Sequence, residues 1–259
     1  MIRTLSHKLT ALWTNGRRAE RIGYTVALLA FTSGLFHLIV YAIDGGSWSG
    51  PVSWRKPVTF GLSFGIVLAT IVWVSTYINI RPRARNILIG VFTAASAYEV
   101  AGITVQRWRG LPSHFNNEDP VSAVIMVGLA AGGGVLVAVV IALTVLSLRR
   151  NPDAPPSMML SVRAGLLILV AAMASGAAMI ATGVVLSDTQ GVEAAYRQAG
   201  WLKPTHAATM HAVTVLPALS LLTSCMDRTE TWRLTVAKLA TAAYAAAAAV
   251  TIAVNLVVA

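Results

Sequence analysis

The sequence predicts an all-α, polytopic membrane helix bundle with about seven transmembrane helices. Three observations support this fold class. First, 56% of the 259 residues are hydrophobic and only 12% are charged, whereas soluble domains carry about 25% charged residues. Second, the apolar residues occur in runs of roughly 20, the length that a helix needs to cross about 30 Å of hydrocarbon. Third, the segments between the runs are short and rich in glycine, proline and charge, as loops are.

The first 21 residues are polar and basic and precede the first apolar run. Apolar side chains at helical spacing favour an amphipathic helix on the membrane surface, with a disordered basic tail as the alternative. These side chains are Leu5, Leu9, Leu12 and Trp13. The apolar run from Ile22 is too long for a signal-peptide core and lacks a clear cleavage site, so it is the first predicted transmembrane helix. The expected division is a basic cytoplasmic segment, 1–21, and a seven-helix domain, 22–259.

Seven apolar segments are expected to span the membrane. They are residues 22–43, 57–78, 86–106, 121–147, 163–186, 206–226 and 235–258. Gly61 and Gly65 form a Gly-xxx-Gly step in the second segment, and Gly132, Gly133 and Gly134 interrupt the fourth, which indicates close helix packing in lipid. The longest interruption, residues 187–204, is predicted to be a loop.

The distribution of basic residues predicts the orientation. With the N-terminus inside and the C-terminus outside, 14 of the 20 Lys and Arg residues fall on the cytoplasmic side, as the positive-inside rule requires. The six outer ones are Arg55, Lys56, Arg107, Arg109, Arg197 and Lys203. The expected location is the cell membrane, with the lipid bilayer as the principal partner.

Three ionisable residues, His37, Glu99 and His211, lie inside predicted spans, where charge is costly and therefore points to function. His37 lies seven residues before Asp44, Glu99 eight before Arg107, and His211 eight after Lys203. At 1.5 Å of rise per residue, all three lie roughly 10–12 Å below the outer boundary. We therefore predict a buried polar layer of these three residues, provided that they face one another.

A second candidate layer lies above the first, in the outer connections. Trp54, Trp108 and Trp201 fit the belt of aromatic residues found at membrane interfaces. Basic side chains beside them suit an anionic group such as a phosphate, a haem propionate or a lipid head group. The candidate outer-face residues are Arg55, Lys56, Gln106, Arg109, His114, Asn116 and His206.

Histidines also raise the question of a metal or haem cofactor, since neutral imidazole ligates zinc, copper and haem iron. His206 and His211 are five residues apart, which rotates them by about 140° on a helix and disfavours chelation of one ion. Ligands from different helices, such as His37 with His211 or His114 with His206, are more suitable. These four histidines are the candidate ligands of a transition metal or haem.

Several segments resemble a family of uncharacterised bacterial multi-pass membrane proteins of the actinobacterial type. The shared segments are Trp54-Arg55-Lys56-Pro57, Arg109-Gly110-Leu111-Pro112-Ser113-His114-Phe115-Asn116 and His206-(four residues)-His211-Ala212. The most specific is Arg-Gly-x-x-Ser-His-Phe-Asn. The resemblance implies a fold and a membrane location and no activity. A fainter likeness to membrane hydrolases of the alkaline ceramidase type lacks the matching intramembrane aspartate and the expected histidine spacing.

Other classes are excluded by pattern. The net charge of +10 comes from short basic clusters between apolar runs, so nucleic acid is not an expected partner. No phosphate loop or Gly-x-Ser-x-Gly elbow occurs, and Ser113 beside His114 is not expected to form a catalytic triad, because sequence neighbours rarely meet in that geometry. Lys238 lies at the cytoplasmic end of the last span, which disfavours a retinal Schiff base.

The leading hypothesis is a membrane-embedded binding or redox module whose outer-face site takes a metal, a haem or an anionic ligand. Three alternatives stay open. The first is a small proton-coupled transporter using Glu99, and the second is a metal-dependent lipid hydrolase with a zinc-activated water. The third is a structural subunit of a larger membrane complex.

Overall fold

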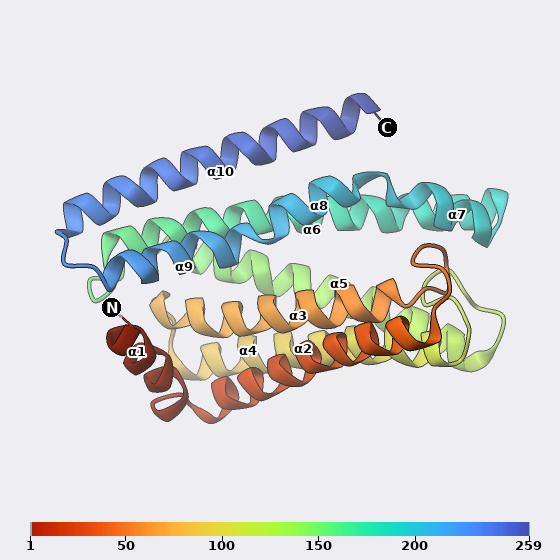
Figure 1. The fold of residues 1–259 in the computed structure, drawn as a ribbon, viewed down its shortest axis with the longest axis horizontal. Coiled ribbons are helices and arrows are strands. Elements are labelled where there is room, and N and C mark those ends of the chain that lie inside the picture. The colour runs from red at the N-terminus through yellow and green to blue at the C-terminus, as the bar shows by residue number, and fades with distance from the viewer. Residues whose placement is uncertain (1, 259) are drawn as a thin grey trace.

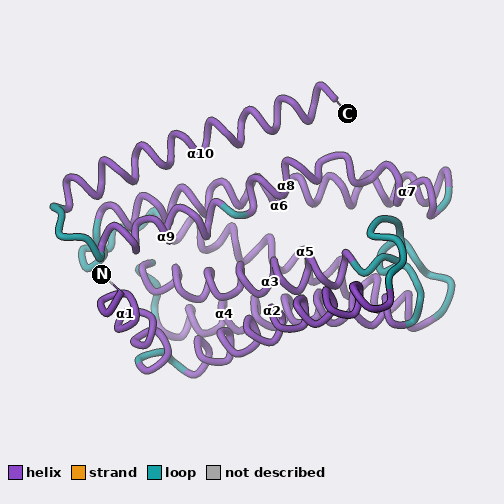
Figure 2. Tube along the Cα trace, viewed as in Figure 1, coloured by secondary structure: helices purple, strands orange, loops and turns teal. Residues whose placement is uncertain are grey.

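The computed structural model describes residues 2–258, and within them the chain is helical with no strand (Figures 1 and 2). The elements are α1 (Ile2–Thr14), α2 (Arg18–Asp44), α3 (Arg55–Val74), η1 (Ser75–Tyr77), α4 (Pro82–Trp108), α5 (Pro120–Ser147), α6 (Pro156–Gln190), α7 (Val192–Gln198), η2 (Ala199–Leu202), α8 (Lys203–Met210), α9 (Ala212–Ser224) and α10 (Glu230–Val258).

Seven helical segments in the described part of the chain are long and apolar enough to cross a membrane, which confirms the predicted fold class. The sixth span, residues 192–224, is composite and contains α7, η2, α8 and α9. The start of α2 and the end of α10 lie at opposite ends of the bundle (Figure 1), as an odd number of spans requires. The assignment of the α2 start to the cytoplasm rests on the Lys and Arg count.

Residues 187–204 are helical instead of forming the predicted loop, which is a correction to the sequence-based boundary. Helix α6 continues to Gln190 and, after Gly191 alone, the chain turns into α7. Gly191 has a φ of 90°, a conformation that favours glycine. The polar residues Ser187, Asp188, Thr189 and Gln190 are still helical, and the helix ends at the glycine.

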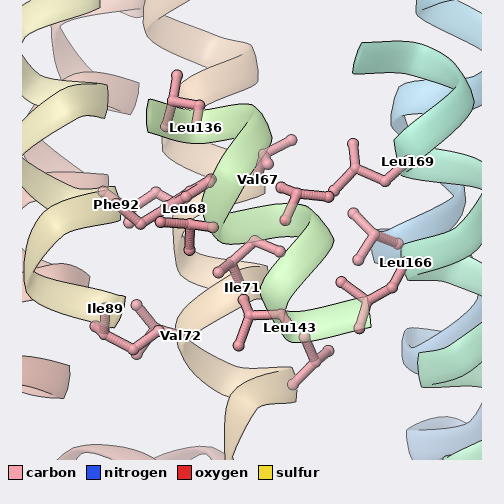
Figure 3. Close-up of a cluster of buried hydrophobic side chains, with 14 of the residues drawn as sticks. Val67, Leu68, Ile71, Val72, Ile89, Phe92, Leu136, Leu143, Leu166 and Leu169 are labelled. Atoms are coloured by element: carbon pink, nitrogen blue, oxygen red, sulfur yellow. The ribbon is translucent and has the colours of Figure 1, made fainter. Parts of the chain in front are cut away.

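The core lies where α3, α4, α5 and α6 meet (Figure 3). Leu68 and Ile71 of α3, Leu143 of α5 and Leu166 of α6 are fully buried there. Large hydrophobic side chains elsewhere on the spans remain exposed, including Leu28 at 63% and Leu239 at 67%. This distribution suits a bundle whose outer surface contacts lipid chains.

Helices α2 and α3 pack backbone against backbone at glycines. A Cβ on Gly61 would lie 2.6 Å from the Gly34 nitrogen and 2.8 Å from the Ala30 carbonyl oxygen. A Cβ on Gly65 would lie 2.8 Å from the Phe31 nitrogen. The Gly-xxx-Gly step is therefore the surface on which α2 lies, and this contact fixes the start of α3 beside the end of α2.

Candidate functional site at the outer end of the bundle

An aromatic and charged cluster joins the outer ends of α2, α3 and α4. The His37 ring stacks on Trp54 with centroids 5.9 Å apart, and its Nε2 accepts a hydrogen bond of 3.0 Å from Trp108 Nε1. The Arg107 guanidinium lies 3.6 Å from the Trp54 ring centroid. Asp44 accepts the Trp54 indole hydrogen bond at 2.7 Å and forms an ion pair with Arg107 at 3.7 Å. We call these five residues the Trp54 cluster.

His37 has both ring nitrogens engaged in this cluster. Its Nδ1 lies 2.7 Å from the Ser33 carbonyl oxygen, and a carbonyl only accepts, so Nδ1 carries the hydrogen. Nε2 is then the acceptor for Trp108. A metal would bind His37 only after one of these hydrogen bonds is broken. In this geometry His37 holds three helix ends together.

The aromatic belt prediction is wrong for Trp54, which is only 4% exposed. Trp54 precedes α3, and its side chain is covered by His37 and Arg107. Trp108 and Trp201 are 56% and 36% exposed, in keeping with an interfacial position. The burial of Trp54 was not predictable from the sequence, because the residues that cover its ring come from two other helices, α2 and α4.

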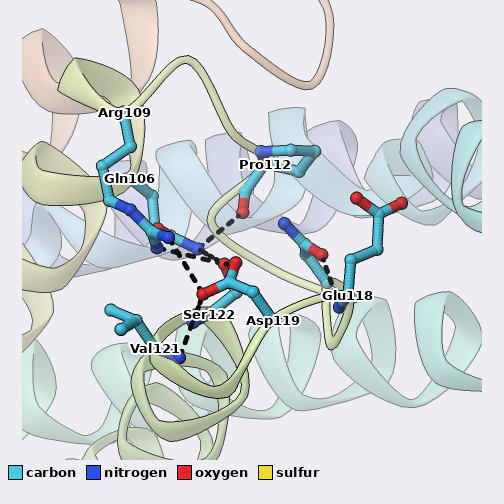
Figure 4. Close-up of polar contacts among 8 residues, drawn as sticks. Gln106, Arg109, Pro112, Glu118, Asp119, Val121 and Ser122 are labelled. Atoms are coloured by element: carbon cyan, nitrogen blue, oxygen red, sulfur yellow. Dashed lines mark hydrogen bonds and ion pairs between the residues drawn. The ribbon is translucent and has the colours of Figure 1, made fainter.

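A polar network closes the loop between α4 and α5 (Figure 4). Gln106, 1% exposed, donates to the Pro112 carbonyl oxygen at 3.2 Å and to Ser122 Oγ at 2.9 Å. Arg109 donates to the Gln106 side-chain oxygen at 2.7 Å and to Asp119 at 2.9 Å. Asp119 also caps α5 by accepting from the Val121 and Ser122 backbone nitrogens. We call Gln106, Arg109, Asp119 and Ser122 the loop clip; Arg109 is neutralised in it.

The loop clip has a predictable pH dependence. Hydrogen bonds from Ser122 and Arg109 lower the pKa of Asp119 to about 2 from an ordinary value of 3.8. Since the folded pKa lies below the unfolded one, the ionised clip stabilises the protein above about pH 4, and that stabilisation is lost as the pH falls toward 2.

We therefore expect Asp119→Ala to lower the melting temperature of detergent-solubilised protein by a constant amount from pH 5 to 8, and by a shrinking amount below pH 4. Thermal unfolding of both proteins across this range measures the effect. Glu118→Ala, which changes the exposed neighbouring carboxylate, is the control. A melting-temperature difference that stays constant down to pH 2 would contradict the assignment.

A second part of the same loop contacts α3 and α7. Lys56 Nζ donates to Ser113 Oγ at 3.2 Å, and Ser113 Oγ lies 2.9 Å from His114 Nδ1. The Lys56 ammonium also lies 4.1 Å from the Tyr196 ring centroid. The Tyr196 hydroxyl donates to the His114 carbonyl oxygen and accepts from the His114 backbone nitrogen. Ser113 Oγ thus contacts both Lys56 and His114. The expectation that Ser113 and His114 form no triad stays a prediction.

The imidazole of His114 carries no charge at physiological pH. Burial, followed by the positive charge of Lys56, lowers the pKa of His114 to about 3. Next along the chain, Phe115 adopts a positive φ of 54° and its ring lies against Gly183 of α6, where a Cβ would come within 2.1 Å of it. Asn116 is buried and its side-chain oxygen accepts from the Glu118 backbone nitrogen. The loop is therefore anchored on α3, α6 and α7.

Three basic residues near this loop, Arg55, Lys56 and Lys203, have no carboxylate partner within residues 2–258. Arg55 and Lys203 are the charges that act on the Lys56 ammonium, and Arg55 also acts on Lys203. The other three outer cations, Arg107, Arg109 and Arg197, are paired with Asp44, Asp119 and Glu193. We call Arg55, Lys56 and Lys203 the unpaired basic group.

The predicted buried layer does not form one site, because its members have separate surroundings. His37 belongs to the Trp54 cluster, whereas Glu99 faces Gly132 of α5. His211 lies at the kink between α8 and α9, near His206. No hydrogen bond, ion pair or ring contact joins any two of the three within residues 2–258.

The four candidate metal ligands are likewise dispersed. His206 Nδ1 lies 2.8 Å from the Ala172 carbonyl oxygen and faces Gly176 of α6, while His114 contacts Ser113. Across the described chain, no three His, Cys, Asp or Glu side chains gather where they could hold a metal ion. The metal and haem assignments therefore stay predictions without a preformed ligand set.

Several residues of this region are absent from the sequence-based candidate set, among them Asp119, Lys203 and Tyr196. Asp119 stands immediately before Pro120 and an apolar run, a helix N-cap signature that could have identified it. The Lys and Arg count places Lys203 on the outer side, but the sequence does not show that it lies near Arg55 and Lys56. Tyr196 gave no signal, because it lies in the segment predicted to be a loop.

The fold and the exposed apolar surface of the spans define an integral membrane protein with seven transmembrane helices. No protein-family model, curated protein or solved structure matches the chain. The resemblance through the Arg-Gly-x-x-Ser-His-Phe-Asn segment accordingly stays a prediction.

Proposed function

We propose that this protein is a multi-pass protein of the cell membrane that binds a phosphate-bearing anion at its outer face through Arg55, Lys56 and Lys203. The observation that carries the proposal is that these three residues have no carboxylate partner among residues 2–258, whereas the other basic residues of the outer face each have one. Unpaired cations held close together repel one another, and an anion relieves that repulsion.

The surroundings of Lys56 support an anion in preference to another class of ligand. Its ammonium is held by one hydroxyl and one aromatic ring, from Ser113 and Tyr196, so that donor capacity remains. Neutral His114 adds polarity without adding charge. The phosphate can come from a lipid head group or from a soluble phosphate compound, and the chemistry of recognition is the same for both.

The test compares wild-type protein with the double variant Arg55→Gln/Lys203→Gln. Basic residues near an anionic membrane surface contribute about 1 kcal/mol each, so the variant is expected to bind roughly 30-fold more weakly. Native mass spectrometry of protein titrated with phosphatidylglycerol, and thermal stabilisation by inorganic phosphate in detergent, measure the two sources separately.

Arg197→Gln is the matched control, because Arg197 is an exposed outer cation already paired with Glu193. The control should bind like wild type in both assays. Binding of lipid alone identifies a head-group site, and stabilisation by inorganic phosphate identifies a soluble ligand. Equal affinity of the wild type and the double variant for both probes would overturn the proposal.

A further inference from the structure

Glu99 is a buried carboxyl group in the apolar part of α4, and it faces a stretch of small residues on α5. It is only 5% exposed. A Cβ on Gly132 would lie 3.2 Å from Glu99 Oε1, and one on Gly133 would lie 3.9 Å away. The glycines therefore provide the space that the carboxyl group occupies. Residues 130–134 read Ala-Ala-Gly-Gly-Gly, so this stretch of α5 carries only small residues.

This carboxyl group has no partner. Within residues 2–258 it forms no hydrogen bond and no ion pair, in contrast to Glu20, the other buried acid, which pairs with Arg85 at 3.7 Å. Transfer of an isolated carboxylate into an apolar medium is so unfavourable that such a group is neutralised instead. Glu99 is therefore expected to be neutral, whereas the ion-paired acids of the bundle carry a negative charge.

The elements packed on α4 bring no compensating charge to this level. Helix α5 contains no ionisable residue from Pro120 to Ser147. The titratable groups of α2 are Arg18, Glu20, Arg21, Tyr24, His37, Tyr41 and Asp44, and those of α3 are Arg55, Lys56 and the adjacent Tyr77. Of these, His37 shares the predicted depth of Glu99, and its ring is neutral, because Nδ1 carries the hydrogen and Nε2 accepts from Trp108. On α4 itself, the neighbouring Tyr98 donates its hydroxyl hydrogen to the Val124 carbonyl oxygen at 3.3 Å, and the arginines lie near the ends.

We infer that Glu99 is a proton-binding site within the membrane, occupied as a neutral carboxylic acid while α4 and α5 are in contact. A metal cation is a poor alternative, because hard cations require several oxygen ligands and α5 presents glycines here. Release of the proton to water leaves a carboxylate that needs water or a cation, so it must be accompanied by separation of α4 and α5 beside Gly132. This inference is independent of the anion site.

Infrared difference spectroscopy of the full-length protein in lipid nanodiscs tests the protonation state directly. At pH 7, the spectrum of wild type minus Glu99→Gln should show the C=O stretching band of a protonated carboxylic acid. Glu118→Gln, a change in the exposed outer loop, should leave this band intact. A pair of carboxylate bands in place of the acid band would overturn the proposal.

The coupling to helix packing has its own test. In a Cys225→Ser background, the thiol introduced by Gly133→Cys should react faster with a water-soluble maleimide once alkaline pH has removed the acid band. The control adds Glu99→Gln to the same variant. Its thiol reactivity should rise with pH only through thiol ionisation, with no additional increase in the reaction rate. Equal rates in the two backgrounds after loss of the band would refute the coupling, and the anion assays are unaffected by either outcome.

Discussion

Replacement of Gly61 by Val is expected to destabilise the protein by about 3 kcal/mol or more, at the upper end of overpacking effects. The Cβ of any larger residue would lie 2.6 Å from the Gly34 nitrogen, 2.7 Å from the Gly34 Cα and 2.8 Å from the Ala30 carbonyl oxygen. These are backbone atoms, so no side-chain rotation can relieve the contact. Relief requires α2 to move away from α3.

Thermal unfolding in detergent, together with the yield of monodisperse protein, measures this effect. Gly90→Val is the matched control, since Gly90 is a helical glycine at which an added Cβ would meet no neighbouring element within 4 Å. The control should keep the wild-type melting temperature within a few degrees. If Gly61→Val unfolded like Gly90→Val, the close packing of α2 on α3 would be disproved.

The second large effect is expected for Trp54→Ala, which should cost about 3–5 kcal/mol, the range for removal of a buried aromatic side chain. The change leaves a cavity and deprives His37, Arg107 and Asp44 of the ring that joins them. Trp54→Phe should recover most of the loss, because it keeps the stacking surface and removes only the hydrogen bond to Asp44, which contributes on the order of 1–2 kcal/mol.

Trp201→Ala is the control for this prediction, because Trp201 is 36% exposed at the same end of the bundle. Chemical or thermal unfolding of the three variants gives the comparison. If Trp54 served only as an interfacial anchor, Trp54→Ala and Trp201→Ala would lower the free energy of unfolding by the same amount. Such a result would restore the aromatic belt interpretation that the burial of Trp54 contradicts.

The helical fold was predictable because run length and apolar composition are local properties of the sequence. Helix ends were less predictable: α6 begins at Pro156 instead of residue 163 and continues to Gln190, since polar residues remain helical after they leave lipid. The Gly61 and Gly65 step correctly indicated close packing, although the partner helix was not identifiable from spacing.

The sequence indicated which residue types lie at this end of the bundle, but it did not indicate which residues contact one another. The loop between α4 and α5 is polar, as its composition indicates, but the interactions of Lys56 with this loop also involve Tyr196, 140 positions away in the chain. Similarly, equal depth of His37, Glu99 and His211 says nothing about the directions in which three helices present them. Rotation of each helix about its axis is set by packing, which no single segment encodes.

The length of α6 has a consequence for how a ligand approaches the outer face. Its 35 residues extend for about 52 Å, and even with a tilt of about 20° they cover more than the 40–45 Å of a bilayer with its head groups. At least one end of α6 therefore projects beyond the head groups. The short helix α7, which follows α6 after Gly191, brings Tyr196 against Lys56. A ligand that reaches the Lys56 ammonium at the outer face therefore also meets the ring of Tyr196.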